Sequence, residues 1–163
     1  METYSIYIGI AIIVIILLPL IFIQKSQLSQ KKKAMNGFKA EALNHNLKIT
    51  EADFWGTYYS IAIDEAANKL IYSKIIDSEQ KITIVDLSQV ASCEILTTFR
   101  SVKNKPTPEK DKIDLLITYK TRAKDVLEFY NIDVNFQMSN EIALLEKWES
   151  HIKNRLVTKS IAA

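Results

Sequence analysis

Twenty consecutive residues near the start of the chain, from Tyr4 to Ile23, carry no charged side chain and read YSIYIGIAIIVIILLPLIFI. A helix of this length, rising about 1.5 Å per residue, spans roughly 30 Å, the hydrocarbon thickness of a bilayer. A buried helix of a soluble domain is the alternative, but a small domain has too little surface to cover such a helix on all sides. The segment therefore predicts one transmembrane helix at residues 4–23.

The flanks of this segment do not resemble those of a cleaved signal peptide. The residues before it contain an acid, Glu2, and no Lys or Arg. The residues after it, QKSQLSQKKK, offer neither a small-residue cleavage site nor a cysteine for lipoprotein processing. We expect an uncleaved anchor, preceded by a short extracytoplasmic terminus at residues 1–3.

The charges around the segment predict its orientation. Glu2 is the only charged side chain before it, and no acidic residue lies between Gln24 and Ala40. Because positively charged flanks stay inside, we expect a single-pass protein of the inner (cytoplasmic) membrane, with its N-terminus outside and its domain in the cytoplasm. The stretch after the span contains five lysines: Lys25, Lys31, Lys32, Lys33 and Lys39.

Residues 24–46 form a basic juxtamembrane connector. It contains no proline and its apolar residues are loosely spaced as on a helix, so we expect it to be helical. The lysines have two interpretations, which can hold together. In the first, they fix the topology. In the second, they hold anionic phospholipid headgroups, at about 1 kcal/mol per residue near the surface.

The composition of the remaining chain excludes several classes of function. From Glu41 onward, 16 Lys and Arg stand against 18 Asp and Glu, so the domain has no electrostatic footprint for nucleic acid. The single cysteine, Cys93, allows no intramolecular disulfide, and His45 and His151 lack the spacing of a zinc site. The three glycines are far apart, which excludes glycine-rich phosphate loops. We expect neither a metal nor a cofactor.

After Asn46 the pattern alternates between apolar and polar residues, which is typical of β-strands. Every second residue from Ile113 to Tyr119, for example, is apolar. Turn-forming residues separate the runs, so we expect an antiparallel meander. The strands are predicted at Leu47–Thr50, Thr57–Ile63, Leu70–Ile76, Lys81–Leu87, Val90–Phe99, Lys112–Lys120 and Asp125–Tyr130.

The last predicted element is an amphipathic helix. Ser139 or Asn140 can cap it, and Glu141 lies in the first turn, where the helix dipole favours an acid. Strands followed by one helix predict an α+β domain at residues 47–157, with about seven antiparallel strands closed by the helix, and a tail at 158–163. The expected apolar stripe consists of Ile142, Leu145, Trp148, Ile152 and Leu156.

The segment IVDLSQVASCEI (84–95), together with the closing helix, resembles the pleckstrin-homology-like (PH-like) superfold, including its bacterial members. WGTYYSIAIDEAANKLIY (55–72), LEFYN (127–131) and LLEKWESHI (144–152) resemble short, single-anchor, uncharacterised bacterial proteins such as those of Bacteroidota. The resemblance implies a PH-like sheet or barrel and no particular activity. PH domains that bind phosphoinositides use a basic first hairpin loop. The equivalent expected here, DEAAN at 64–68, is acidic, which argues against that ligand.

Two regions are candidates for a partner surface. The aromatic residues Phe54, Trp55 and Tyr58 either pack in the core at the start of the sheet or form a protein-binding patch. The proline-containing loop at 104–111 and the residues before it are basic. This loop region is either solvated or contacts a membrane or a partner. Its basic residues are Arg100, Lys103, Lys105, Lys110 and Lys112, against the acids Glu109 and Asp111.

The sequence contains no catalytic constellation. Cys93 is interpreted as a small core residue, although a pairing with His151 in the fold stays open. We expect a membrane-anchored, non-catalytic interaction or scaffold module that binds a protein partner, as an accessory subunit of a membrane complex. The alternative is an anionic-lipid surface sensor that uses the juxtamembrane lysines. An enzyme with an unfamiliar site would need a deep pocket with convergent polar groups.

Overall fold

The computed structural model describes the chain at residues 15, 29, 32–56, 58–76, 79–101, 107–135 and 138–161, with side chains up to residue 156. Apart from Ile15, the predicted transmembrane segment at 4–23 lies outside the described residues. Among the helices that are described, none has the length and apolarity needed to cross a bilayer. The chain divides into two compact units, Met1–Phe38 and Lys39–Ala163, and the second contains every described strand.

Residues 32–44 are helical, which is the part of the predicted connector that the structure describes. The helix ends in a left-handed cap, because Asn46 has a φ of 57°. The Asn46 N–H donates to the Leu43 carbonyl at 2.9 Å, and the Leu47 N–H donates to the Ala42 carbonyl at 2.9 Å. Leu47 therefore belongs to the helix cap, and its side chain is buried.

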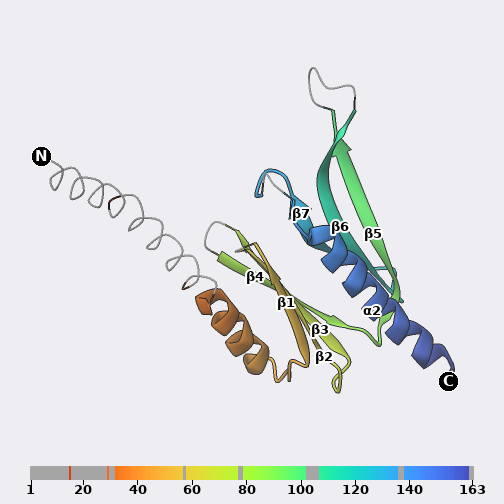
Figure 1. Cartoon of the computed structure of the whole chain (residues 1–163). Coiled ribbons are helices and arrows are strands. Elements are labelled where there is room, and N and C mark those ends of the chain that lie inside the picture. The colour runs from red at the N-terminus through yellow and green to blue at the C-terminus, as the bar shows by residue number, and fades with distance from the viewer. Residues whose placement is uncertain are drawn as a thin grey trace, which may run out of the picture. The chain divides into compact units, whose positions relative to one another are not determined.

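Seven strands pair into two antiparallel sheets, and a C-terminal helix follows them (Figure 1). The larger sheet has the order β1-β2-β3-β4 and the smaller one the order β5-β6-β7. The prediction of an α+β domain with seven antiparallel strands and a C-terminal helix is confirmed. The elements are β1 (Glu51–Trp55), β2 (Tyr59–Asp64), β3 (Lys69–Ile76), β4 (Glu79–Asp86), β5 (Val90–Arg100), β6 (Glu109–Tyr119), β7 (Lys124–Asn131) and α2 (Glu141–Ile161).

The predicted position of the first strand, Leu47–Thr50, is wrong. β1 begins at Glu51 and pairs with β2, from Glu51 opposite Ile63 to Trp55 opposite Tyr59. The first hairpin loop therefore consists of the residues between Trp55 and Tyr59, where Gly56 adopts a left-handed φ of 54°. The expected equivalence of DEAAN (64–68) with this loop is wrong, because DEAAN joins β2 to β3, and its charge says nothing about the first hairpin loop.

Acidic residues in β1, a residue type that is depleted in strands, have partners on α2. The Lys147 Nζ lies 2.7 Å from the Glu51 Oε1 and 2.5 Å from the Asp53 Oδ2. The indole N–H of Trp148 also donates to the Asp53 carboxylate, at 2.9 Å. These contacts fasten α2 to the edge of the larger sheet.

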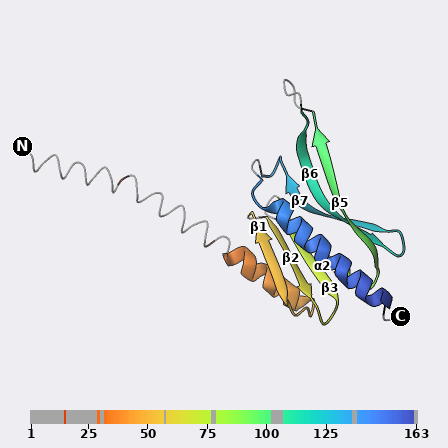
Figure 2. The same cartoon turned by 45° about the vertical axis from the view of Figure 1, so that its right-hand side comes forward.

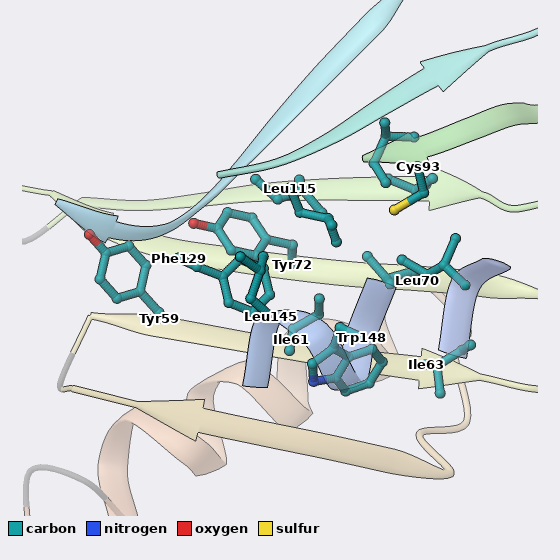
Figure 3. Packing of buried hydrophobic residues seen from close by; sticks show 14 of the residues in the cluster. Tyr59, Ile61, Ile63, Leu70, Tyr72, Cys93, Leu115, Phe129, Leu145 and Trp148 are labelled. Atoms are coloured by element: carbon teal, nitrogen blue, oxygen red, sulfur yellow. The ribbon is translucent and has the colours of Figure 1, made fainter. Parts of the chain in front are cut away.

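One hydrophobic core joins both sheets and α2 (Figures 2 and 3). α2 contributes Leu145, Trp148 and Ile152, which are fully buried. Ile142 is 36% exposed, so its predicted place in the apolar stripe is wrong. The buried position in the first turn belongs to Glu141, whose carboxylate accepts the N–H of Ser139, just before the helix, at 2.5 Å.

Candidate functional site

A cleft of about 450 Å³ opens where β3 and β4 of the larger sheet face β6 and β7 of the smaller one. Its volume lies in the range of small-ligand sites. Unlike the apolar core beside it, the cleft is lined mainly by charged side chains. They are four lysines, Lys74, Lys81, Lys112 and Lys124, and three acids, Asp114, Asp125 and Glu128.

A β-bulge in β7 places these charges. Ile113 pairs with Tyr130 but Asp114 pairs with Glu128, so Phe129 is an extra residue in β7. The Phe129 side chain is fully buried and its ring stacks on that of Trp55, with centroids 4.5 Å apart. The bulge thus keeps Phe129 in the core while Glu128 faces the other sheet. Figure 3 shows Phe129 among the core side chains.

Glu128 is the best-connected group of the cleft. Its carboxylate forms an ion pair with Lys74, accepts the Tyr59 hydroxyl at 2.6 Å and accepts the Asn131 side-chain amide at 3.1 Å. Burial acts to raise the pKa of Glu128, but the hydrogen bonds from Lys74 and Tyr59 outweigh it and hold that pKa below its ordinary value. Glu128 is therefore ionised at neutral pH, and its charge is compensated.

Asp114 lies directly opposite Glu128 in the register and is 7% exposed. Within the described part of the chain, no hydrogen bond or ion pair compensates its carboxylate. Burial, and secondly the charge of Glu128, raise the pKa of Asp114 to about 6, although Lys112 and Lys74 act in the opposite direction. The cleft thus holds one carboxyl group that titrates close to neutral pH.

Three of the four cleft lysines form no ion pair with the described acidic side chains. Lys74 is paired with Glu128, and the Asp125 carboxylate accepts the Tyr119 hydroxyl at 2.6 Å. Among the described side chains, no acid comes within ion-pair distance of the remaining lysines. An anionic group that entered the cleft would therefore meet uncompensated ammonium groups, those of Lys81, Lys112 and Lys124.

The juxtamembrane lysines are only partly described. Lys25 and Lys31 lie outside the described residues. Lys32, Lys33 and Lys39 are exposed on the helix at 32–44. Their ammonium groups are therefore accessible to solvent.

The candidate partner surface separates into different environments. Trp55 is 4% exposed and stacks between Tyr59 and Phe129. It therefore packs in the core and is not part of an exposed protein-binding patch. Phe54 is half-buried, and Tyr58 is 41% exposed. The structure does not bring these three residues together as one exposed patch.

In the basic region, Arg100 lies 3.2 Å from Asp133 and 3.8 Å from Asp111, so it is not an uncompensated cation. Lys103 and Lys105 lie outside the described residues. Lys112, from the same region, lines the cleft.

Cys93 is buried in the core, and His151 contacts neighbouring side chains. Cys93 is 1% exposed, and burial raises the pKa of its thiol to about 12. His151 stacks on Trp148 with ring centroids 5.7 Å apart, and its Nδ1 lies 3.5 Å from Glu51. The described residues contain no cluster of metal-ligating side chains.

Among the charged residues of the cleft, sequence reasoning singled out Lys112, as part of the basic loop region. It did not single out the others, because each is one charge in an alternating strand. The available signal was the placement of two acids among apolar residues. Asp114 interrupts IDLLI and Glu128 interrupts VLEFY. A carboxylate at the centre of such a strand needs a partner or a function.

Comparisons of the chain with protein-family models, with curated proteins and with solved structures gave no match.

Proposed function

We propose that the chain is a single-pass membrane protein with a non-catalytic, PH-like binding domain, and that its cleft receives an acidic segment of a protein partner. The uncharged segment at 4–23 supports the anchor. The order of four strands, three strands and a closing helix supports the PH-like assignment. The observation that carries the binding function is the group of uncompensated lysines, Lys81, Lys112 and Lys124, around the cleft.

The cleft suits binding better than catalysis. Glu128 is fixed by three hydrogen-bonding partners, and the Tyr72 hydroxyl donates to the Glu128 carbonyl at 2.6 Å. Neither group is positioned to act as a nucleophile on a bound molecule. The lysine ammonium groups, in contrast, suit the recognition of carboxylates without any chemical step.

A protein segment fits the cleft better than an inorganic anion does. Two apolar side chains, Ile76 and Val126, line it and are 45% and 54% exposed. A peptide can supply apolar side chains to these residues as well as carboxylates to the lysines. In addition, β4 and β7 are terminal strands of their sheets, and such strands accept extended segments.

The proposal is tested by calorimetric titration of the full-length chain in nanodiscs of zwitterionic lipid. The probe is a six-residue peptide that alternates glutamate and valine, and its lysine–valine counterpart is the negative control. We expect only the acidic peptide to bind, and we expect Lys112→Glu combined with Lys124→Glu to weaken binding at least tenfold. Lys32→Glu combined with Lys39→Glu makes the same change in net charge on an exposed helix and should leave binding unchanged.

The binding proposal fails if the acidic peptide does not bind to the wild-type chain. It also fails if the two double variants weaken binding equally, because the effect would then come from net charge alone.

The sensing of anionic lipid is retained as a second candidate, because Lys32, Lys33 and Lys39 are all exposed on the described helix. It predicts that amide exchange in residues 32–44 of the full-length chain is slower in nanodiscs with anionic lipid than in zwitterionic ones. The difference should disappear at high salt. Equal exchange in the two lipids at low salt would remove this function.

A further inference from the structure

The smaller sheet leaves one long strand edge without a partner strand. β5 pairs with β6 on one side only, and the order of the sheet is β5-β6-β7. Among the described residues, β5 donates one backbone hydrogen bond outside its sheet. It runs from the Val90 N–H to the Leu87 carbonyl, at 3.4 Å. An unpaired edge of this length is a template for pairing with another chain.

The C-terminal half of this edge is exposed and apolar. Near its start β5 buries Cys93, whereas Ile95, Leu96 and Phe99 are 37%, 45% and 56% exposed. Figures 1 and 2 both show this half of β5 extending past α2 together with β6. Three large apolar side chains within five residues of an open edge make a monomer prone to association.

The sequence of this half is complementary to itself. β5 runs from Ser92 to Thr98 without a register shift, and the shift beyond Thr98 places its extra residue, Asp111, in β6. Residues of even number from 94 to 100 therefore share one face of the sheet, and residues 95, 97 and 99 share the other. When two copies pair antiparallel about Thr97, opposite charges meet on one face and apolar side chains on the other. The opposed pairs are Glu94 with Arg100, Leu96 with Thr98, and Ile95 with Phe99.

Other registers lose this match. A shift by one residue pairs side chains of opposite faces. A shift by two residues in either direction places Glu94 opposite Thr98, or Leu96 opposite Arg100, and removes the contact between opposite charges. Pairing about Thr97 forms the Glu94–Arg100 contact twice in the dimer, since the axis is two-fold.

We propose that the β5 edges of two copies of this chain pair antiparallel about Thr97, so that the two small sheets join into one continuous sheet. This dimer does not depend on the cleft, which lies at the other side of the same sheet, between β6–β7 and β3–β4. The second copy is the occupant because this edge carries both members of the Glu94–Arg100 pair and both members of the apolar Ile95–Phe99 pair.

The register is tested by cross-linking the full-length chain in membranes. Thr97→Cys, in a Cys93→Ala background, places two thiols opposite each other across the axis. A short bis-maleimide should then give a covalent dimer. Thr121→Cys in the same background is the matched control, because Thr121 is exposed in the turn between β6 and β7 and should give monomer. No dimer with Thr97→Cys, or equal dimer with both variants, would overturn the proposal.

The charge pair is tested by sedimentation of the full-length chain in detergent. Glu94→Lys and Arg100→Glu should each raise the dissociation constant at least tenfold, and the double variant should restore dimerisation. Arg100→Glu also breaks the ion pairs with Asp133 and Asp111, so rescue by Glu94→Lys isolates the contact between copies. Glu79→Lys, on β4, should leave the dimer unchanged. A monomeric wild-type chain, or a double variant without rescue whose tryptophan fluorescence is native, would contradict the pairing.

Discussion

Asp114 and Glu128 face each other across β6 and β7, and both are carboxylic acids in strands that border the core. Like charges in opposed positions destabilise a sheet. Glu128 keeps its charge because Lys74 and Tyr59 stabilise it. The ionised form of Asp114 is instead destabilised, by burial and by the Glu128 charge, which raises the pKa of Asp114. A carboxyl group held at such a cost beside uncompensated lysines is typical of a functional site.

The first prediction concerns the stability cost of Asp114. Its folded-state pKa of about 6 lies above the ordinary 3.8, so the folded chain binds more protons than the unfolded one between these values. Stability is therefore lost as the pH rises through this window. We expect Asp114→Asn to raise the free energy of unfolding by about 1–2 kcal/mol at pH 7.5, discounted for water in the cleft, and to change it little at pH 3.5.

The measurement is urea unfolding of the full-length chain in detergent, followed by tryptophan fluorescence. Trp55 and Trp148 are both buried in the core, so they report on this domain. An asparagine variant that is less stable than the wild type at pH 7.5 would contradict the assignment.

The second prediction links the same carboxyl group to binding. An acidic peptide in the cleft repels ionised Asp114 and tolerates its protonated form. Affinity should therefore fall several-fold as the pH rises from 5.5 to 7.5, across the pKa of about 6. Asp114→Asn should remove most of this dependence. Calorimetric titration at several pH values measures it, and a wild-type affinity that rises with pH would refute the link.

The third prediction concerns the ion pair between Lys74 and Glu128, in which both side chains are 14% exposed. Lys74→Met leaves a largely buried carboxylate without its cation, which we expect to cost about 2–4 kcal/mol of stability. Lys81 lies opposite Lys74 in the register, is exposed and has no ion pair among the described residues. Lys81→Met is therefore the control, with an expected change of less than about 0.5 kcal/mol. Equal effects in urea unfolding would show that the pair is not structural.

The fourth prediction uses Cys93 as a reporter of the core. The thiol is 1% exposed and its pKa is raised to about 12, so little thiolate forms and reagents have little access. We expect Cys93 to stay unmodified by a maleimide in the folded chain and to react on unfolding in urea. Thr121→Cys introduces an exposed thiol that should react at once. Fast modification of Cys93 under native conditions would place it outside the core.

Much of the fold could be predicted because the alternation of apolar residues is local. The strands from β2 to β7 lie within three residues of their predicted bounds. β1 could not be found in this way, because its acids are matched by Lys147 and Trp148 on a distant helix. Ile142 was misplaced for a related reason, since the buried position of the first turn is taken by Glu141, which accepts the Ser139 N–H.

The cleft could not be predicted because it depends on how the two sheets meet. The bulge at Phe129 turns Glu128 toward Lys74, and no local pattern marks a bulge of this kind. The isolated acids Asp114 and Glu128 were a visible signal of buried charge. Their partners, however, come from the other sheet and from positions far apart in the sequence.

Binding of an acidic segment in the cleft can be followed at single side chains by methyl NMR of the full-length chain. Ile76 and Val126 line the cleft and are exposed, whereas Ile142 is exposed on α2 and does not line it. During titration with the glutamate–valine peptide, we predict saturable shifts of the Ile76 and Val126 methyl signals and none of Ile142. Shifts at Ile142 with none at Ile76 and Val126 would show that the peptide does not bind in the cleft.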